Sequence, residues 1–411
     1  MKVAVLCKSD STGGAAVTSR RLTEALNANG VQATLLVLET KSGSRYVEKA
    51  RFPLLETWSF LKERLHIYFA DGFSRTNLFK IDTGECGLPL WRHPVVKEAD
   101  AVILNWVNQG MLSLKGVRKI LAMGKKVVLT MHDMWNFTGV CHHAMECRRY
   151  LDECGCCPLL GRNATPEDLS HKIWRKKKAL YTPSDITFVA VSSWLENCAR
   201  NSSLLAYQEI KRIPNAFPTE DICPTRGLSP RDPYRILFVA ARLDDSIKGL
   251  ETLKKAFDIL ADKQPELARK LTLVLIGDVK TPGSIEGFAV NTKYKGRVDD
   301  PEMMRQAYGK ASVVVSASHF ENLPGTLIEG QAYGCVPVAF DRGGQRDIID
   351  HLSTGFLAPW SSDVTSRASA LADGIAWAIG RTDDIRQKMR ESVIDKFSYN
   401  KIANEYIRLL G

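Results

Sequence analysis

Two runs of alternating strands and helices limit most strongly how this chain can fold. The first run begins with the apolar strand Val3–Cys7, passes through the turn Gly13-Gly14 and a helix over residues 16–29, and reaches a second apolar strand at Val31–Leu38. A strand, a glycine turn, a helix and a strand in this order are typical of the opening of a doubly wound parallel sheet. Further buried strands are expected at Ala101–Asn105, Lys126–Thr130, Phe188–Ser192 and Ile210–Pro214.

The same alternation restarts after a proline-containing segment, residues 217–233, which is expected to be a linker. Its strands are expected at Arg235–Ala240, Leu271–Ile276, Val313–Ser316, Val336–Ala339 and Gly355–Leu357, with a helix at Leu250–Leu260. The length of 411 residues also exceeds what one hydrophobic core usually supports. We therefore predict an α/β protein with doubly wound domains at residues 1–216 and 234–383, and a C-terminal helix at 384–411 that packs back on the first domain.

Composition indicates an ordinary soluble protein whose charge is uneven. Residues 1–216 carry 30 Lys and Arg against 20 Asp and Glu, so they hold the whole net charge of +10. A basic half favours an anionic partner such as phosphate, acidic lipid or nucleic acid, although solubility alone also explains it. There is no apolar run long enough to span a membrane and no nucleic-acid reader motif. We expect a cytoplasmic protein without a specific nucleic-acid partner.

Two segments of the basic half have alternative interpretations. Leu54–Phe69 has apolar residues at helical spacing, which favours a packing helix; its mixed charges argue against a helix lying on a membrane. The run of four cations Arg175–Lys178 is flanked by aromatic residues. A solvated helix face is the commoner explanation for such a run, and a peripheral contact with an anionic membrane is the alternative.

The segment Ser316–Glu329 has the features of a ligand-binding loop. It follows an apolar strand, a helix is expected to begin near Pro324, and carboxylates stand at Glu321 and Glu329. The amino end of a helix suits an anionic or hydroxyl-rich ligand because its N–H groups are unpaired.

Other polar residues also follow strands of the predicted sheets. Arg242 and Lys248 follow the first strand of the second domain, and two cations so placed could clamp a diphosphate. His132 and Asp133 follow a strand of the first domain, and Gly343-Gly344 allows a close backbone approach. Ligands of doubly wound sheets bind at the carboxyl ends of the strands, so these residues are site candidates.

The ordered set of these motifs resembles the glycosyltransferases of family 4, also called group 1 glycosyltransferases: Gly13-Gly14, His132-Asp133, Arg242 with Lys248-Gly249, Glu321 with Glu329, and Gly343-Gly344. The resemblance implies the GT-B fold, two facing Rossmann-like domains with a C-terminal helix that crosses back. It also implies retaining transfer of a sugar from a nucleoside-diphosphate donor of UDP or GDP type, with no cofactor required.

The resemblance implies a donor site that draws on both domains: Gly13, Gly14, Arg242, Lys248, Arg297, Val298, Glu321, Asn322, Leu323, Gly325 and Glu329. Arg242 and Lys248 would bind the diphosphate, Glu321 the donor sugar and Glu329 the ribose. One departure is Asn-Leu-Pro-Gly after Glu321, where the family often has Gly-Phe-Gly; Pro324 supplies no N–H to the sugar.

The catalytic residues implied by the resemblance are Glu321, His132, Arg242 and Lys248. Arg297 and Val298 match the place where the base of the donor lies. The stretch from His132 to Cys141 resembles a subgroup found in bacterial surface-polysaccharide loci. This implies a glycan or polyprenyl-diphosphate-linked acceptor, contacted on the side of Asp133, His142 and His143.

A cysteine-rich insertion occupies about residues 139–160. Cysteines 141, 147, 154, 156 and 157 are half of the ten in the chain. Disulfides are rare in the cytoplasm, so Cys141, Cys147, Cys154 and Cys157 are candidate ligands of a structural zinc ion. Reduced thiols that pack a loop explain the cluster equally well.

Three alternatives to a transferase remain open at this point. A nucleotide-sugar epimerase has the same two-domain fold, a non-catalytic protein could only bind the nucleotide sugar, and the basic half could bind nucleic acid. Conversion of a nucleotide sugar without any acceptor would distinguish the epimerase.

Overall fold

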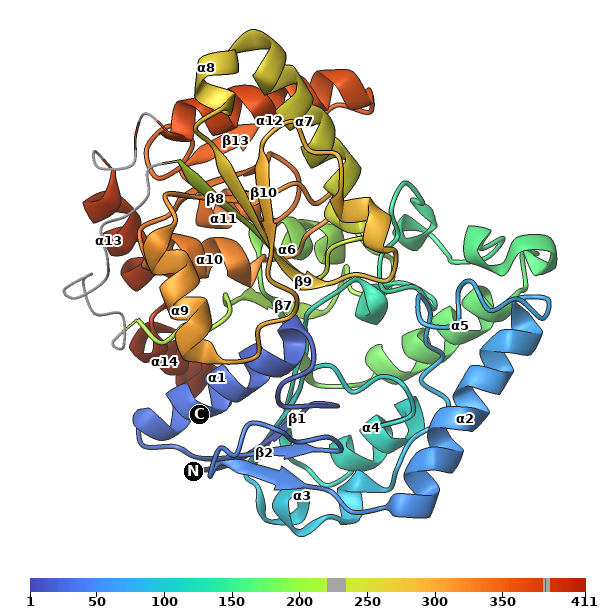
Figure 1. The fold of residues 1–411 in the computed structure, drawn as a ribbon. Coiled ribbons are helices and arrows are strands. Elements are labelled where there is room, and N and C mark those ends of the chain that lie inside the picture. Colours follow the sequence, from blue (N-terminus) through green and yellow to red (C-terminus); the bar gives the residue numbers. More distant parts are fainter. Residues whose placement is uncertain (220–233, 380, 382–384) are drawn as a thin grey trace. The chain divides into compact units, whose positions relative to one another are not determined.

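The computed structural model describes residues 1–219, 234–379, 381 and 385–411, which form two compact units (Figure 1). The first unit comprises Met1–Ala216 with Tyr399–Gly411, and the second comprises Phe217–Ser398. Each unit contains one parallel sheet with helices beside it. The predicted α/β class and doubly wound topology are therefore confirmed for each unit.

The sheet of the first unit has seven strands in the order β3-β2-β1-β4-β5-β6-β7. Their bounds are β1 Lys2–Leu6, β2 Gln32–Val37, β3 Val47–Lys49, β4 Ala101–Leu104, β5 Lys126–Met131, β6 Ile186–Ala190 and β7 Glu209–Arg212. All neighbouring strands are parallel. The direction of winding reverses between β1 and β4, so the loops after these strands border the switch point where doubly wound folds bind ligands.

Seven α-helices accompany this sheet in the described part of the first unit: α1 Gly14–Ala28, α2 Pro53–Ala70, α3 Pro94–Glu98, α4 Leu114–Leu121, α5 Leu169–Tyr181, α6 Ser193–Arg200 and α14 Tyr399–Leu410. The core holds α1, the central strands and the inner side of α14 together. Two hydrogen bonds fasten α14, from the hydroxyl of Tyr399 to Glu24 at 3.0 Å and between Tyr406 and Thr130 at 2.9 Å.

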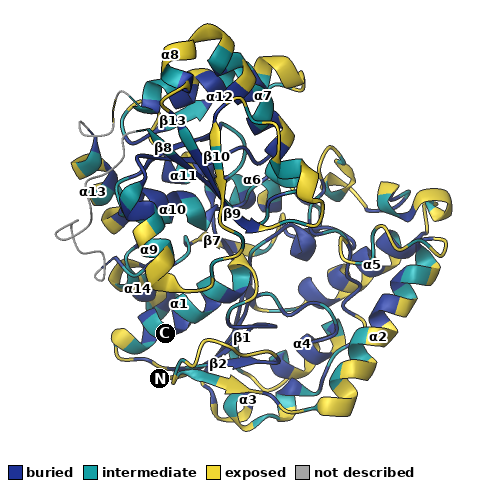
Figure 2. Cartoon of the chain, viewed as in Figure 1, coloured by how far each residue is buried: buried dark blue, intermediate teal, exposed yellow. Residues whose placement is uncertain are grey.

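The sheet of the second unit has six parallel strands in the order β10-β9-β8-β11-β12-β13. The strands are β8 Arg235–Arg242, β9 Thr272–Asp278, β10 Asn291–Tyr294, β11 Val313–Ser316, β12 Val336–Phe340 and β13 Phe356–Ala358. The helices are α7 Leu250–Lys263, α8 Pro265–Ala268, α9 Pro301–Lys310, α10 Gly325–Ala332, α11 Gln345–Ile348, α12 Val364–Ile379 and α13 Arg386–Phe397. Winding reverses between β8 and β11. Strands β11 and β12 are buried throughout, whereas β8 is buried only at Ile236, Leu237 and Phe238 (Figure 2).

Short 3₁₀ helices lie in the connecting loops: η1 Leu90–Arg92, η2 Trp135–Phe137, η3 Arg149–Leu151, η4 Pro158–Asn163, η5 Ser246–Lys248 and η6 Pro282–Ile285. Among the described residues, no helix is both long enough and apolar enough to cross a membrane.

The C-terminal segment differs from the single helix expected over residues 384–411. It forms two helices: α13 ends at Phe397 and α14 begins at Tyr399. Ser398 lies between them, and its extended ψ of 148° breaks the helix. Helix α13 belongs to the second unit and α14 to the first. Of the predicted linker 217–233, residues 220–233 lie outside the described residues. At the start of this segment, the N–H of Phe217 donates to the carbonyl of Phe397 at 2.8 Å.

The segment Leu54–Phe69 forms a helix, α2, but not the packing helix expected from its pattern. Its apolar side chains are exposed, whereas Glu63, Arg64 and Ile67 are buried. The expectation was wrong because spacing shows that a helix has an apolar face without showing what that face meets.

Candidate functional site

In the second unit, the loops after β8, β11 and β12 meet at the carboxyl edge of the sheet. The N–H of His319, after β11, donates to the carbonyl of Ile247, after β8, at 2.7 Å. Gly249 has a left-handed φ of 72°, and a Cβ there would lie 2.0 Å from the carbonyl oxygen of Ala317. Only glycine allows this approach, so the sequence Lys248-Gly249 serves to bring two loops into contact.

Lys248 and Glu321 form an ion pair where these loops meet. Lys248 ends η5, Glu321 lies between β11 and α10, and the Nζ–Oε1 distance is 2.6 Å. Both side chains are partly buried, so each limits the movement of the other. The structure thus joins two residues that are 73 positions apart in the sequence and that both belong to the predicted donor site.

The loop after β12 supports the backbone of Glu321. The N–H of Gly344 donates to the carbonyl of Glu321 at 3.1 Å. Gly343 has a φ of 93°, and a Cβ at this position would lie 2.2 Å from the same carbonyl oxygen. The predicted Gly343-Gly344 motif is therefore a close backbone approach that positions Glu321.

Replacement of Gly343 by Ala should test this support. The new Cβ would push against the carbonyl of Glu321, and we expect the free energy of unfolding to fall by about 1–3 kcal/mol more than in the control. The control is Gly287→Ala, because Gly287 also has a positive φ of 74° but nothing lies within 4 Å of its Cβ position. Urea unfolding of both variants measures the difference. Equal losses in the free energy of unfolding would show that the positive φ alone causes the effect and that the contact with the carbonyl of Glu321 does not contribute.

The second predicted diphosphate residue, Arg242, lies at the start of the β8 loop that also carries Lys248, and the predicted base residues lie in the loop after β10. Arg242 is the last residue of β8 and pairs with Asp245 at 3.1 Å and Asp244 at 3.5 Å. Arg297, in the loop after β10, pairs with Asp299 at 2.7 Å. Both guanidinium groups are partly exposed and are held by carboxylates two or three residues further along the same loops. Val298, next to Arg297, is half-buried.

The remaining predicted donor residues lie on the loop before α10 and on α10 itself. Asn322 and Leu323 are buried, and α10 begins at Gly325 with Pro324 as its extended N-cap residue. Glu329 lies inside the helix and accepts a hydrogen bond from the hydroxyl of Tyr308 at 3.1 Å. Glu321 and Glu329 therefore have different neighbours, Lys248 and Tyr308 respectively.

Sequence reasoning missed an aromatic and cationic group next to this edge. Arg342 precedes Gly343 after β12 and lies 4.0 Å from the ring centroid of Trp360. Trp360 also contacts the ring of His319 at 5.4 Å. The signal for Arg342 was available, because it is a cation at the carboxyl end of a strand, as Lys248 is.

In the first unit, Gly13 and Gly14 occupy the turn after β1. Gly13 has a φ of 92° and is the N-cap of α1, and Gly14 is the first residue of that helix. No atom lies within 4 Å of either Cβ position, and both residues are exposed. The turn needs glycine at position 13 for its backbone conformation and leaves the amino end of α1 open.

His132 lies at the carboxyl edge of the first sheet, directly after β5. Its Nε2 donates to the side-chain oxygen of Asn105, the residue after β4, at 2.8 Å. Burial lowers the pKa of His132 to about 4 despite the neighbouring Asp133. The ring is therefore neutral near pH 7 and oriented by a partner on the adjacent strand.

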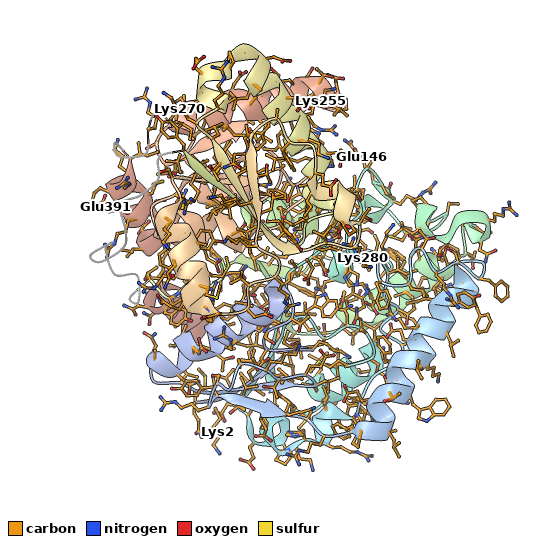
Figure 3. All side chains as sticks on the ribbon, viewed as in Figure 1. Lys2, Glu146, Lys255, Lys270, Lys280 and Glu391 are labelled. Carbon is orange, nitrogen blue, oxygen red and sulfur yellow. The ribbon has the colours of Figure 1, made fainter. Side chains whose placement is uncertain are left out.

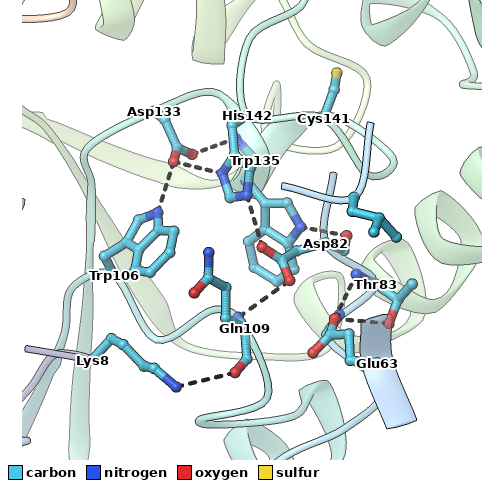
Figure 4. Close-up of polar contacts among 12 residues, drawn as sticks. Lys8, Glu63, Asp82, Thr83, Trp106, Gln109, Asp133, Trp135, Cys141 and His142 are labelled. Atoms are coloured by element: carbon cyan, nitrogen blue, oxygen red, sulfur yellow. Dashed lines mark hydrogen bonds and ion pairs between the residues drawn. The ribbon is translucent and has the colours of Figure 1, made fainter. Parts of the chain in front are cut away.

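Asp133, His142 and Asp82 form a buried chain of charged groups (Figure 4). His142 donates from Nδ1 to Asp133 at 2.7 Å and from Nε2 to Asp82 at 2.8 Å. Asp133 also accepts from the indole of Trp106 at 3.0 Å, and Asp82 accepts from the guanidinium of Arg64. These contacts attach the start of the cysteine-rich insertion to the loop after β5.

The histidine in the middle of this chain is held as a cation. Burial disfavours the imidazolium form of His142, but the carboxylates of Asp133 and Asp82 raise its pKa to about 10. Burial would likewise raise the pKa of Asp133, but the charge of His142 and its hydrogen bond lower it to about 2. His143 also lowers the pKa of Asp133 and is half-buried. His142 thus acts as a fixed cation between two carboxylates.

The sequence contained no signal for Asp82, Arg64 or Glu63, which complete this region. Glu63 accepts from the N–H of Thr83 at 2.8 Å, and burial together with Asp82 raises its pKa to about 7. These residues come from α2 and from an irregular segment before β4. Neither periodicity nor strand position distinguishes them.

The cysteine-rich insertion forms loops with η3 and η4. Cys154 and Cys157 are buried, Cys141 and Cys147 are half-buried, and all four are free thiols. Within the described ranges, no group of three or more His, Cys, Asp or Glu side chains is arranged to hold a metal ion. The zinc proposal therefore rests on the sequence spacing alone.

The run Arg175–Lys178 is not a uniformly solvated helix face. Lys177 is completely buried, donates to the carbonyls of Trp135 and Thr138, and lies 3.5 Å from the ring centroid of Trp135. Burial lowers its pKa to about 7. Lys176 pairs with Glu85 and Lys178 lies 4.6 Å from the ring centroid of Trp174, so three of the four cations have partners inside the unit.

With this geometry established, the sequence itself provides a family match. Residues 233–379 match the family described as Glycosyl transferases group 1. A curated relative, glycogen synthase from Rhizobium rhizogenes (strain K84), is 25% identical over 173 residues. That match covers 38% of this chain and 36% of the relative, so the chain spans only about a third of the relative's length.

Solved structures match over the whole chain. HepE from Anabaena in complex with UDP-glucose has a TM-score of 0.60 at 15% identity and covers 100% of this chain and 99% of its own. Sucrose-phosphate synthase from Thermosynechococcus elongatus has a TM-score of 0.63 at 18% identity, with 100% and 98% covered. At these identities the likeness shows the fold, two Rossmann-like domains as in GT-B glycosyltransferases.

Proposed function

We propose that this protein is a retaining glycosyltransferase of the family 4 type that takes its sugar from a nucleoside-diphosphate donor. The observation that carries the proposal is the Lys248–Glu321 ion pair of 2.6 Å, formed where three strand-end loops converge. It lies within the segment that matches the group 1 glycosyltransferases. A cation suits the diphosphate, and a carboxylate suits the hydroxyl groups of a sugar.

The proposed reaction builds negative charge on the leaving diphosphate. Lys248 and Arg242 would stabilise this charge, and Glu321 would hold the donor sugar in position. The acceptor hydroxyl attacks the anomeric carbon from the side of the leaving group, so a new carbon–oxygen bond forms as the bond to phosphate breaks. The acceptor proton passes to the departing phosphate oxygen. No cofactor takes part in this scheme, which remains a prediction.

We assign the acceptor side to the first unit. The neutral ring of His132 donates from Nε2 to Asn105, so any hydrogen bond with a sugar hydroxyl would be one that Nδ1 accepts. Asp133 and His142 are buried and paired with each other, so they would position this region. From the resemblance of residues 132–141 we propose a glycan or polyprenyl-diphosphate-linked acceptor in surface-polysaccharide synthesis, which would bring the enzyme to the inner face of the plasma membrane.

A thermal-shift comparison of nucleoside diphosphates tests the donor class. UDP is the first to try, because the HepE structure contains UDP-glucose, and GDP and ADP are the comparisons. A ligand that binds only the folded state stabilises it by about 2.7 kcal/mol at a hundred times its dissociation constant. We expect one nucleotide to raise the melting temperature in the wild type and not in Lys248→Ala. Equal shifts in both proteins would contradict the assignment of Lys248.

Product analysis distinguishes a transferase from the two alternatives, an epimerase and a non-catalytic protein that only binds the nucleotide sugar. Incubation with the stabilising nucleotide sugar, with and without acceptor, should give a transfer product only when acceptor is present. A changed sugar configuration without acceptor supports the epimerase. Binding without any conversion under either condition supports the non-catalytic binding protein.

A further inference from the structure

Helix α2 is held to its unit by polar side chains. Glu63 accepts hydrogen bonds from the N–H groups of Thr83 and Gly84 at 2.8 and 3.1 Å. Arg64 donates to the carbonyl of Leu78 and pairs with the fully buried Asp82. These contacts determine which side of α2 faces the protein, and they leave the other side outward.

The outward side of α2 is apolar. Its residues recur every three or four positions and are between 47 and 78% exposed: Leu54, Trp58, Leu61, Leu65 and Phe69, with Leu55 beside them. Phe73, just beyond the helix, packs edge-on against Phe69 at 5.5 Å and is also exposed. Figure 2 shows the exposed outer side of α2, and Figure 3 shows side chains projecting from it. Single exposed apolar residues are ordinary, but a continuous row indicates an interaction surface.

The exposed charges of the segment that carries this row have one sign, and the nearby acid Glu85 is paired with His66 and Lys176. From residue 51 to residue 80 the exposed charged residues are Arg51, Lys62, Arg75 and Lys80. The acids of the same segment are turned away from solvent: Glu63 and Asp71 are buried, and Glu56 is half-buried. An apolar row bordered by cations is complementary to an anionic lipid surface. A two-fold contact between copies of the chain would instead bring these cations near one another.

We propose that the outer face of α2 docks this protein on an anionic lipid bilayer. The face consists of Leu54, Leu55, Trp58, Leu61, Leu65, Phe69 and Phe73 with the cations Arg51, Lys62, Arg75 and Lys80. The apolar side chains enter the boundary between headgroups and acyl chains, and the cations contact lipid phosphates. This face is separate from the run Arg175–Lys178, of which Lys177 is buried.

Flotation of the full chain with vesicles tests the apolar part. The wild type should float with vesicles of phosphatidylglycerol and phosphatidylcholine. Trp58→Ser combined with Leu65→Ser should lower the bound fraction by at least about tenfold. The matched control is Tyr207→Ser, which removes a side chain that is 98% exposed elsewhere in the same unit. The changed residues are all exposed, and equal melting temperatures would verify that folding is intact.

Charge reversal tests the lipid class. Lys62→Glu with Arg75→Glu should lower binding to the same vesicles by at least about tenfold at low salt. Added salt should reduce this difference, because it screens charges at the surface. Vesicles of phosphatidylcholine alone should bind the wild type much more weakly.

Three outcomes would overturn the proposal. They are full vesicle binding by the Trp58 and Leu65 double variant, equal binding of the wild type to neutral vesicles, and a wild-type dimer without vesicles that the double variant converts to a monomer. The last result would assign the face to a second copy of the chain. No nucleotide sugar is present in these experiments, so their result is independent of the proposed transferase activity.

Discussion

Replacement of Lys248 by Ala is expected to lower the rate of sugar transfer by about 10²–10³-fold. Removal of one group that stabilises developing charge in a preorganised site has effects of this size. The substitution also leaves Glu321 without its partner at 2.6 Å, beside the position proposed for an anionic diphosphate. Initial rates with saturating donor and acceptor measure the loss.

The control for this experiment is Lys263→Ala. Lys263 is the last residue of α7 in the same unit and pairs with Asp373 at 3.2 Å, but both side chains are well exposed. Its loss should leave the rate within about twofold, since exposed ion pairs contribute little. Glu321→Gln keeps the shape of the side chain and removes its charge, and it should also be strongly impaired. Full activity of Lys248→Ala or of Glu321→Gln would refute the site assignment.

Replacement of His142 by Gln is expected to lower the free energy of unfolding by about 3–5 kcal/mol. The imidazolium is buried between Asp82 and Asp133, and loss of one member of a buried ion-paired group leaves uncompensated charge. Urea unfolding at pH 7 measures the effect. The control is His66→Gln, because His66 pairs with Glu85 at 3.2 Å but is substantially exposed and should cost less than about 1 kcal/mol.

The pH dependence of this difference provides a second check. The pKa of His142 is raised from 6.5 to about 10 in the folded protein, so the unfolded chain loses this proton at lower pH. The stabilisation is complete below pH 6.5 and is lost as the pH rises through about 10. The gap between wild type and His142→Gln should therefore narrow from pH 7 to pH 10. A gap that stays constant over this range would show that His142 is not held as a cation.

The role of this buried group is to position the loop after β5. Asp133 is fixed by His142 and by the indole of Trp106, and it adjoins His132, whose ring is oriented by Asn105. Movement of Asp133 would therefore reach His132 through the backbone. The cysteine-rich insertion contains His142, so this contact joins it to the loop that carries His132.

The sequence by itself determined the fold class and the strand ends at which ligand-binding residues are predicted. Apolar runs of strand length separated by helical periods require parallel sheets covered by helices, and both units have this topology. Residues such as Lys248, Glu321 and His132 could be selected because the carboxyl end of a parallel strand is set by chain direction. To apply this rule one needs only the order of strands and loops along the chain, and that order can be predicted from the sequence.

Only the tertiary structure decided which side chains face inward. The pattern of α2 predicted an apolar face but could not show that Glu63 and Arg64 would find buried partners about twenty residues away while that face stayed outward. Lys177 lies inside for the same reason, because the carbonyls that receive it belong to a distant loop. A buried polar group requires partners of matching geometry, and such partners are brought together by folding rather than by spacing in the sequence.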